Sequence, residues 1–565
     1  MNRAATNVDL SRALLFAAGA ILFLSFGYTE MMGSDMWWHL AAGRELLQTG
    51  TLWMVDHWSY SMAGSDWLNH EWLSDIIFIG WASAFDVPSL VYWKWLVIMA
   101  TFSILQYVLY RQCGDALAAF LSAGLAVAIA APFLDVRPHL YSLLNYALLL
   151  ALLLERKPRT WVLALLFLIW VNLHGGFFFG LMALGILLFP WRDLTLANIR
   201  GAFVVGVICL LAATLNPSGV KTFLYPLSYA FDSSSPYRQL GEWLSPFTPG
   251  GIRSPLFFYF MWFPVVALLY TLPRLRKAVD VPWEGIALTA LTLAMALTSR
   301  RFIPLFGMSL ALMLAPLLGL LLQRIQGRKL RLGLAALALL SSLYRMLPYP
   351  LASGPAFHYL VAEVVYPVDT VNFMEANGIK GKVYALYNWG GYLHWRTDGD
   401  IQVYIDGRAD TIFDARAYHH YVGVLSNRPG WMDAIAATGA EYVLWSNHRG
   451  NGEDKLRQMM ASSDWVPVYQ DSASWLLAHK STKLPEKMRG SPATPWRDQS
   501  AARNAARGGN LEEAQHYAEK VREVMPWHQD ACVLLISLHR NEGRPQEAQS
   551  VLNACRSYFP AKALR

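Results

Sequence analysis

Carboxylate, imidazole and guanidinium side chains stand at the ends of long apolar runs in this sequence. Asp35 follows the first run, His39 comes four residues later, and Glu71 belongs to the same polar segment. A second acid begins the short segment Asp135-Val136-Arg137-Pro138-His139, between two further runs. A carboxylate can take the proton of an attacking hydroxyl, and a guanidinium forms charge-assisted bonds to phosphate oxygens. These residue types predict base-assisted transfer of a group carried on a phosphate.

We interpret Asp35, Asp135, His39 and Glu71 as candidate catalytic residues. Candidate substrate-binding residues are Arg137, His139, His174, Arg300, Arg301, Asp56 and His70. Each also has a structural interpretation: an isolated aspartate can cap a helix, His174 can pack in a hairpin, and Arg300 and Arg301 can anchor a helix by snorkelling. The functional interpretation gains weight because all these residues are predicted to emerge at one membrane surface.

The composition shows what must position them. The chain has 565 residues, 55% of them apolar and only 15% charged, with a mean hydropathy of +0.28, whereas soluble proteins carry about 25% charged residues. This excludes an ordinary soluble enzyme. Apolar runs follow one another between residues 10 and 350 and predict about eleven membrane helices. They are 12–31, 88–110, 114–133, 139–154, 160–174, 176–190, 201–216, 254–272, 282–298, 302–322 and 329–347.

The positive charges orient these helices. Threading the spans from a cytoplasmic N-terminus places fifteen cations in short cytoplasmic segments, in accord with the positive-inside rule. They are Arg3, Arg12, Arg111, Arg156, Lys157, Arg159, Arg192, Arg200, Arg274, Arg276, Lys277, Arg324, Arg328, Lys329 and Arg331. The net charge of +7 therefore reflects topology and gives no support for nucleic-acid binding. Residues 71–85 are interpreted as an interfacial or re-entrant helix, because a crossing there would invert every later loop.

The candidate residues then share the outer face with residues 350–565. An acid directly after the first helix, a long first outer loop, a second acid in the next outer loop and a soluble C-terminal domain resemble the GT-C superfamily of membrane glycosyltransferases. The nearest class is that of the dolichyl-phosphate-mannose and aminoarabinose transferases. The resemblance implies that Asp35 is the base and that Asp135 positions the acceptor or a metal. Many members have a second adjacent acid where this chain has Met36, so His39, Glu71 or Asp56 could be the partner of Asp35.

The predicted function is transfer of a sugar from a polyprenyl-phosphate carrier to an acceptor on the extracytoplasmic face. Alternatives are an oligosaccharyltransferase or O-antigen ligase using a lipid diphosphate, or a non-enzymatic scaffold or transporter. The sequence contains no GxxxxGK[ST] motif, and this absence argues against an ATP-driven transporter. The sequence identifies no certain cofactor. A Mg²⁺ or Mn²⁺ ion bound by Asp35 and Asp135, with Glu71 as a further candidate ligand, is an open alternative, and no zinc-type spacing occurs. The expected location is a bacterial inner membrane, with the C-terminal region periplasmic.

The expected domains are a membrane region (10–350), an α/β domain (355–480) and helical repeats (500–565). Gly509 to Ala514 recurs as Gly543 to Ala548, an offset of 34 residues that is typical of tetratricopeptide (TPR) repeats and predicts a protein partner. Cys532 and Cys555 could form a disulfide there, while Cys113 and Cys209 should be buried thiols. Asp406 and Arg408 could staple a turn or contact substrate. The six tryptophans of the first outer loop, Trp37, Trp38, Trp53, Trp58, Trp67 and Trp72, could anchor at the interface or stack on sugars.

Overall fold

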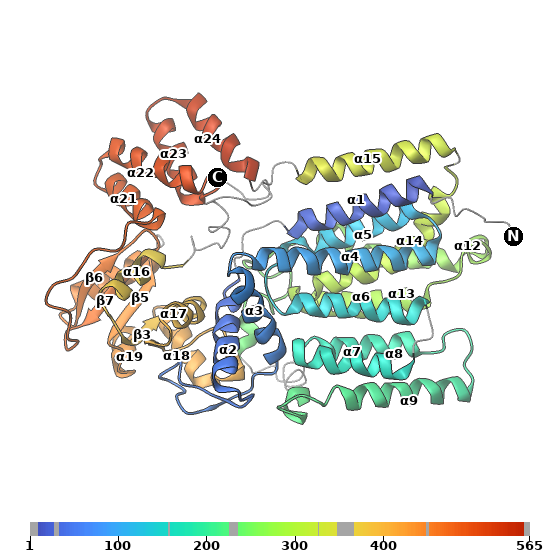
Figure 1. The fold of residues 1–565 in the computed structure, drawn as a ribbon, viewed down its shortest axis with the longest axis horizontal. Coiled ribbons are helices and arrows are strands. Elements are labelled where there is room, and N and C mark those ends of the chain that lie inside the picture. Colours follow the sequence, from blue (N-terminus) through green and yellow to red (C-terminus); the bar gives the residue numbers. More distant parts are fainter. Residues whose placement is uncertain are drawn as a thin grey trace. The chain divides into compact units, whose positions relative to one another are not determined.

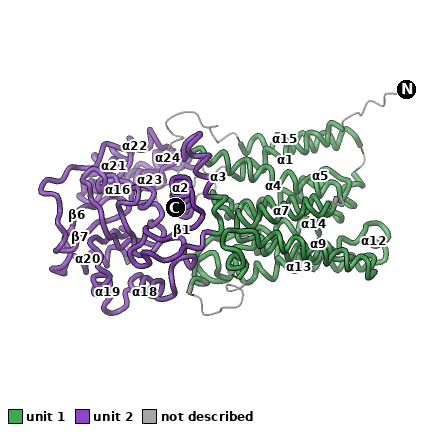
Figure 2. Tube along the Cα trace, turned by 60° about the horizontal axis from the view of Figure 1, so that its bottom comes forward, with its two compact units in different colours: residues 1–28, 70–74, 89–347 green, residues 29–69, 75–88, 348–565 purple. Residues whose placement is uncertain are grey.

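The computed structural model describes residues 9–27, 33–155, 159–224, 236–325, 327–346, 366–447 and 451–558. The chain forms two compact units (Figures 1 and 2). Unit 1 contains residues 1–28, 70–74 and 89–347, and unit 2 contains residues 29–69, 75–88 and 348–565. Arg3, Arg156, Lys157, residues 28–31 of the first predicted span, residues 355–365 of the predicted α/β domain and the last seven residues lie outside the described part.

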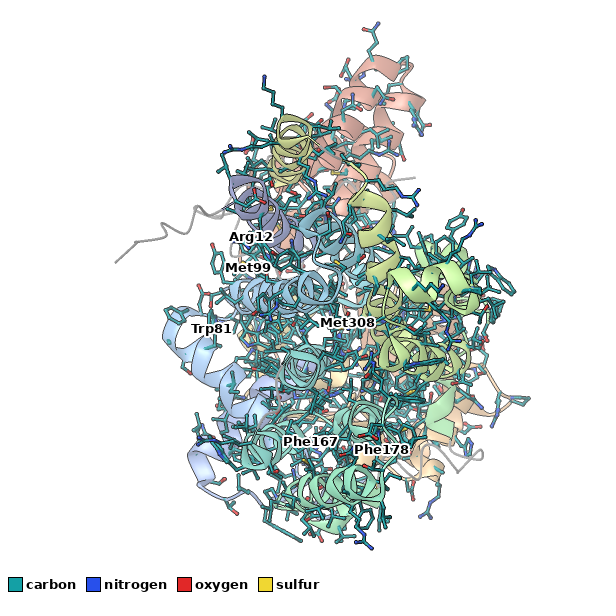
Figure 3. All side chains as sticks on the ribbon, turned by 90° about the vertical axis from the view of Figure 1, so that its right-hand side faces the viewer. Arg12, Trp81, Met99, Phe167, Phe178 and Met308 are labelled. Atoms are coloured by element: carbon teal, nitrogen blue, oxygen red, sulfur yellow. A yellow bond between two sulfur atoms is a disulfide. The ribbon has the colours of Figure 1, made fainter. Side chains whose placement is uncertain are left out.

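Unit 1 is helical. Its α-helices are α1 (Leu10–Gly27), α4 (Leu90–Cys113), α5 (Ala116–Ala130), α6 (His139–Glu155), α7 (Thr160–Leu173), α8 (Phe177–Leu188), α9 (Leu196–Ala212), α11 (Pro255–Phe260), α12 (Pro273–Ala278), α13 (Trp283–Thr298), α14 (Ile303–Leu322) and α15 (Arg328–Met346). Short 3₁₀ segments cover Ala131–Phe133, Pro236–Gln239, Phe263–Thr271 and Arg300–Phe302. Figure 3 looks at these helices end on, and Met308 of α14 and Phe167 of α7 are fully buried among them.

Four described helical segments are long and apolar enough to cross a membrane: Leu10–Gly27, Leu90–Cys113, Ala116–Phe133 and Arg300–Leu322. Most other predicted spans are apolar helices of 10 to 17 residues. Residues 329–347 fall in α15, which carries the cations Arg328, Lys329, Arg331 and Arg345. Residues 72–85 form α3, another short apolar helix (Trp72–Phe85). The membrane region is thus helical as predicted, with four helices of clear spanning length among the described residues.

Local sequence explains the tight junction between α4 and α5. Gly114 ends α4 in the left-handed conformation, with φ of 67°. Asp115 then caps α5, because its side chain accepts the backbone N–H groups of Leu117 and Ala118. Small residues let helices approach closely: a Cβ on Gly307 of α14 would lie 3.1 Å from the Ala126 carbonyl oxygen of α5. Packing of this kind buries α14 along nearly its whole length.

Unit 2 is built on a five-stranded sheet in the order β4-β3-β5-β7-β6. The strands are β3 (Gly381–Ala385), β4 (Ile401–Val403), β5 (Tyr442–Ser446), β6 (Trp465–Gln470) and β7 (Ser474–His479). β3 runs parallel to β4 and β5, and β7 pairs antiparallel with β5 and β6. The associated helices are α16 (Val368–Ala376), α17 (Gly390–Arg396), α18 (Ala415–Leu425), α19 (Trp431–Ala437) and α20 (Asn451–Ala461). An α/β domain in this part of the chain agrees with the sequence pattern.

Unit 2 also contains most of the first outer loop. That loop forms α2 (Asp35–Thr49), the two-stranded ribbon of β1 (Met54–Val55) and β2 (Asp66–Trp67), and most of α3. It pairs with the edge strand β4: the Val403 N–H donates to the Trp58 carbonyl (3.0 Å), and the Tyr60 N–H donates to the Val403 carbonyl (3.1 Å). The loop therefore extends the sheet by a strand-like segment. This differs from the predicted domain bounds, which include the loop in the membrane region.

The last four described helices of unit 2 are α21 (Pro495–Arg507), α22 (Leu511–Val524), α23 (Gln529–Asn541) and α24 (Pro545–Tyr558). Successive helices pack on one another. A disulfide joins Cys532 of α23 to Cys555 of α24, as the sequence suggested. Cys113 and Cys209 are buried free thiols, which confirms that prediction. The helix-pair pattern is compatible with TPR-like repeats, which stay a prediction.

Candidate functional site

Asp35 is the first residue of α2 and is half-buried. The Ser34 hydroxyl donates to its Oδ1 (3.1 Å). The turn after β4 approaches the same oxygen, since a Cβ on Gly407 would lie 3.3 Å from Asp35 Oδ1 and 3.3 Å from the Trp38 ring. Glycine at position 407 lets the backbone of this turn come close to the predicted base.

His39 lies one helical turn after Asp35 and is buried. Its Nδ1 lies 2.5 Å from Asp75 Oδ1, and the other carboxylate oxygen of Asp75 accepts the Asn69 side-chain amide (2.8 Å). The imidazole also stacks against Trp38, with ring centroids 3.6 Å apart. Asp75, which the sequence analysis did not select, is therefore a partner of His39. An acid in the first turn of an otherwise apolar helix was the available sequence signal.

Asp56 lies in a buried cluster with Arg408 and Asp406, which are distant from it in the sequence. Arg408 places Nη1 2.7 Å from Asp56 Oδ1, and its Nε and Nη2 bond to Asp406 at 2.8 to 3.1 Å. All three side chains are buried. Asp56 also accepts the backbone N–H and hydroxyl of Ser59. The Asp56 carboxylate is thus enclosed and bonded within the protein, and its predicted contact with substrate stays a prediction. Asp406 and Arg408 staple their turn, as one of the two interpretations expected.

Aromatic rings surround the Arg408 guanidinium. Its Cζ lies 4.5 Å from the ring centroid of Trp58, 4.9 Å from Trp67 and 5.6 Å from Phe413. Such contacts stabilise a desolvated cation. His394 also stacks on Trp58, with ring centroids 4.1 Å apart, and its pKa lies well below the usual value because the ring is buried and Arg408 is nearby. Trp58 and Trp67 are therefore structural.

The remaining tryptophans of the loop differ in exposure. Trp37 and Trp38 are buried in unit 2, whereas Trp53 is 60% exposed. Trp72 is half-buried and donates its indole N–H to Asn172 (2.7 Å). Trp53 is the one best placed for the predicted interfacial or sugar-stacking role.

The adjacent residues Arg300 and Arg301 in unit 1 have different surroundings. Arg300 is fully buried, and its guanidinium donates to the carbonyl oxygens of Gly241, Ser245, Thr248 and Gly250. Arg300 therefore orders residues 241–250, and its predicted phosphate contact stays a prediction. Arg301 is 29% exposed and lies over Trp243, 4.6 Å from the ring centroid. Among described residues, the Arg301 Nε and Nη1 atoms have no hydrogen-bond partner.

His174 presents a single proton toward Arg301. The Trp170 indole N–H donates to Ser142 Oγ (2.8 Å), and this hydroxyl is hydrogen-bonded to His174 Nδ1 (2.7 Å). The Gly176 N–H also donates to Nδ1 (2.9 Å). Nδ1 of the neutral ring is therefore unprotonated, and the ring proton is on Nε2.

The protonated Nε2 of His174 lies 3.2 Å from Arg301 Nη2 and 3.6 Å from Glu71 Oε1. Two donors at 3.2 Å cannot satisfy one another, so they call for an acceptor that both can reach. Glu71 is on one side of this pair, and its Oε1 also lies 3.6 Å from His70 Nε2. The structure thus brings Glu71, His70, His174 and Arg301 together in unit 1.

Glu242, which the sequence analysis did not select, joins Arg137 to this cluster. Arg137 donates to both carboxylate oxygens of Glu242 (2.8 and 3.3 Å), and Arg301 Nη1 lies 3.9 Å away. Burial alone would raise the Glu242 pKa, but Arg137 and Arg301 outweigh it and hold the pKa at about 2. Glu242 is an isolated acid in a long loop, so no motif or residue spacing in the sequence marks it as a site residue.

Asp135 and His139 shape the neighbouring turn. Asp135 Oδ1 accepts the Val136 N–H (2.7 Å), and Lys94 Nζ lies 4.0 Å from the same oxygen. Lys94 is fully buried in α4. A lone lysine within an apolar run is unusual enough to have been a sequence signal. His139 Nε2 donates to the Phe133 carbonyl oxygen (2.6 Å), a contact that shapes the turn.

The described residues contain no group of three or more His, Cys, Asp or Glu side chains arranged to hold a metal. Asp35 belongs to unit 2 and Asp135 to unit 1. The Lys94 ammonium lies 4.0 Å from the Asp135 carboxylate. Binding of Mg²⁺ or Mn²⁺ by Asp35 and Asp135 stays a prediction.

No protein-family profile and no curated protein sequence matches this chain. Among solved structures, the oligosaccharyltransferase AglB from Archaeoglobus fulgidus, in complex with an inhibitory peptide and a dolichol-phosphate, is similar over 96% of this chain and 86% of its own, with a TM-score of 0.53 and 11% identity. The apo form of an oligosaccharyltransferase from the same organism gives a TM-score of 0.51 at 11% identity over 95% and 86% of the two chains. At 11% identity these likenesses show a shared fold, and the four long apolar helices of the described residues are those of a protein that could span a membrane.

Proposed function

We propose that the chain is a membrane glycosyltransferase of the GT-C type that uses a polyprenyl-phosphate-linked sugar. The observation that carries the proposal is the pair of donors on His174 and Arg301, 3.2 Å apart, which a phosphate oxygen would bridge. They lie at the ends of apolar helices, His174 directly after α7 and Arg301 just before α14. A lipid carrier could keep its tail in the membrane while its phosphate reached these donors.

The proposed reaction forms one bond and breaks one. An acceptor hydroxyl oxygen bonds to the anomeric carbon, the bond from that carbon to the phosphate oxygen breaks, and the lipid phosphate leaves with the electron pair. Asp35 takes the hydroxyl proton. Arg301 and the Nε2–H of His174 stabilise the charge that develops on the phosphate, while Arg137 holds Glu242 beside Arg301. The other predicted residues, Asp135, His39, Glu71, His70, His139, Asp56 and Arg300, stay proposed contributors to catalysis or substrate binding.

The finer topology is also a proposal: eleven spans, basic turns in the cytoplasm and the C-terminal region in the periplasm of a bacterial inner membrane. The disulfide between Cys532 and Cys555 supports it, since such bonds persist in oxidising compartments. Within this scheme residues 10–350 form the membrane region, residues 355–480 the α/β domain and residues 500–565 a TPR-like tail that recruits a protein partner.

A second function, oligosaccharide transfer from a lipid diphosphate, is favoured by the similar structures, both of which are oligosaccharyltransferases. One of them was solved with a peptide and a dolichol-phosphate. The two functions differ in the carrier and the acceptor. Purified protein offered a polyprenyl-monophosphate sugar or a polyprenyl-diphosphate oligosaccharide should release lipid phosphate from the first and not the second; the reverse result would establish the second function.

The donor-site proposal is tested with two substitutions of Arg301 and a control substitution elsewhere in unit 1. Arg301→Gln should slow release of polyprenyl phosphate at least about 100-fold, because one charge-assisted donor to the leaving group is lost. Arg301→Lys should recover part of the rate, since it restores the charge without the fork of donors. The control Arg276→Gln removes an exposed cation from α12 and should behave as wild type. Wild-type turnover by Arg301→Gln would overturn the assignment.

A further inference from the structure

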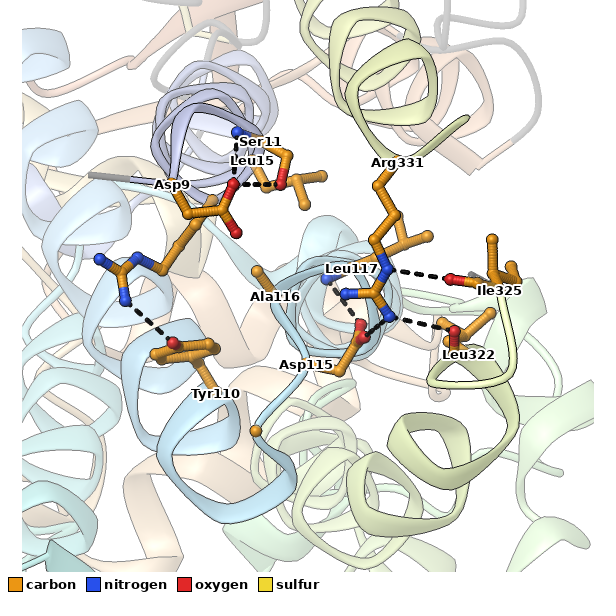
Figure 4. A pocket seen from close by; sticks show the side chains of 12 residues that line it. Asp9, Ser11, Leu15, Tyr110, Asp115, Ala116, Leu117, Leu322, Ile325 and Arg331 are labelled. Atoms are coloured by element: carbon orange, nitrogen blue, oxygen red, sulfur yellow. Dashed lines mark hydrogen bonds and ion pairs between the residues drawn. The ribbon is translucent and has the colours of Figure 1, made fainter. Parts of the chain in front are cut away.

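A small cavity lies in unit 1, where α1 and α15 begin and α4 passes into α5 (Figure 4). Its volume is about 70 Å³. Since one water needs about 10–15 Å³, this space holds about five heavy atoms, the size of a phosphate, and a larger group would extend from it toward the exposed Asp9. The residues that line it are Asp9, Ser11, Arg12, Leu15, Tyr110, Gly114, Asp115, Ala116, Leu117, Leu322, Ile325 and Arg331. None of them belongs to the proposed transfer site.

Two opposite charges face this cavity without pairing with each other. Arg331 donates from Nε to the Ile325 carbonyl and from Nη2 to Asp115 (2.8 Å) and the Leu322 carbonyl. Asp9 Oδ1 accepts the N–H (3.1 Å) and the hydroxyl (2.8 Å) of Ser11, and the carboxylate also accepts the Arg12 backbone N–H. Among the described side chains, Arg331 Nη1 and Asp9 Oδ2 therefore keep unused hydrogen-bonding capacity.

Arg12 adds a second cation on the α1 wall. Its Nη1 donates to the Tyr110 hydroxyl (3.1 Å), and its Cζ lies 5.8 Å from the Tyr110 ring centroid. The four charged side chains of the lining, Asp9, Asp115, Arg12 and Arg331, sum to zero. A simple anion would meet the Asp9 carboxylate, and a simple cation would meet the two guanidiniums. A group carrying both charges suits the lining best.

We propose that this cavity binds the phosphoethanolamine head group of a membrane phospholipid. The phosphate would accept from Arg331 Nη1, and the ammonium would donate to Asp9 Oδ2. The position fits a lipid, because Leu15, Leu117 and Leu322 line the cavity and α15 leads from it along a surface of exposed leucines, among them Leu337 and Leu340. Acyl chains could follow that surface into the hydrocarbon layer. The site is separate from the proposed sugar transfer and does not depend on it.

The proposal is tested by native mass spectrometry of the full-length protein, purified in detergent and offered equal amounts of phosphatidylethanolamine, phosphatidylcholine and phosphatidylglycerol. We expect wild type to retain one phosphatidylethanolamine preferentially, since phosphatidylcholine cannot donate to Asp9 and phosphatidylglycerol has no cation. Asp9→Asn should lower this preference about tenfold, the effect of losing one charge-assisted bond. Its amide oxygen can still accept from Ser11, so the start of α1 is preserved.

The control Asp280→Asn removes an exposed acid from the segment between α12 and α13 and should keep the wild-type preference. Equal retention of the three lipids by wild type, or an unchanged preference in Asp9→Asn, would overturn the proposal. In a last measurement, soluble O-phosphoethanolamine is added to the protein with its bound lipid. It should leave the bound lipid in place, and displacement at comparable concentration would show that the occupant is a soluble molecule and not a lipid.

Discussion

The Arg408 guanidinium lies 2.7 Å from the Asp56 carboxylate, and neither side chain is exposed. The two residues are about 350 positions apart in the sequence, one in the first outer loop and one after β4. Their contact, together with the backbone bonds at Val403, fixes the loop that carries the predicted base to the α/β sheet. The C-terminal region of this chain thus contributes directly to the position of Asp35.

Removing Arg408 should destabilise unit 2 strongly. Arg408→Met leaves Asp56 and Asp406 buried without their shared cation, which costs about 3 kcal/mol or more of unfolding free energy. The control Arg416→Met removes an arginine that is 91% exposed, whose surface pair with Asp414 should contribute less than about 1 kcal/mol. Thermal unfolding of the purified protein measures the difference, and similar melting temperatures for the two variants would contradict the structural role of Arg408.

A methyl group at position 407 should disturb Asp35 more than it disturbs the fold. In Gly407→Ala the new Cβ meets Asp35 Oδ1 and Trp38 at 3.3 Å, so these groups must shift by a few tenths of an ångström. We expect the turnover number to fall about tenfold, since catalysis is sensitive to small displacements. Gly490→Ala is the matched control, because nothing lies within 4 Å of the added Cβ. Equal turnover in both variants would argue against positioning by this turn.

Neutralising the predicted base should abolish transfer without unfolding the protein. Asp35→Asn keeps the shape and an acceptor for the Ser34 hydroxyl but cannot take a proton at neutral pH. A loss of about 10² to 10⁴ in turnover is expected for a general base. Expression and melting temperature should match wild type, and Asp66→Asn, at an exposed acid of the same loop, should stay active. Retained turnover in Asp35→Asn would remove Asp35 as the base.

His394 should make stability depend on pH. Burial and the nearby Arg408 hold its folded-state pKa well below 6.5, so below about pH 6.5 the unfolded chain binds a proton that the folded chain does not. Stability is then fully present above pH 6.5 and is lost as the pH falls, by up to about 1.4 kcal/mol per pH unit.

The variant His394→Phe keeps an aromatic ring to stack on Trp58 and should reduce this loss between pH 6.5 and 5. His516→Gln, at an exposed position in α22, should follow the wild-type curve. Melting temperatures measured across this range check the prediction, which fails if His394→Phe shows the same decline as wild type.

Much of the fold could be read from local patterns. Apolar runs predicted the helical region, strand-like runs predicted the α/β domain, and spacing suggested the Cys532–Cys555 disulfide. The candidate site was harder to predict because its members pair over long distances in sequence. Asp75 and Lys94 carried local sequence signals and Glu242 carried none, but the partners that give each its significance, His39, Asp135 and Arg137, are set by the tertiary structure.

The sequence by itself determined the chemical types available, two arginines in succession at positions 300 and 301 and acids at positions 35 and 56. Only the tertiary structure decided which of these side chains have their hydrogen-bonding capacity taken up by other groups of the protein. Arg300 is surrounded by carbonyl oxygens and Asp56 by donors, while Arg301 and Asp35 stay partly exposed. The physical reason is that a charge is available for chemistry only if its solvation has not been replaced by protein partners, and those partners come from distant parts of the chain.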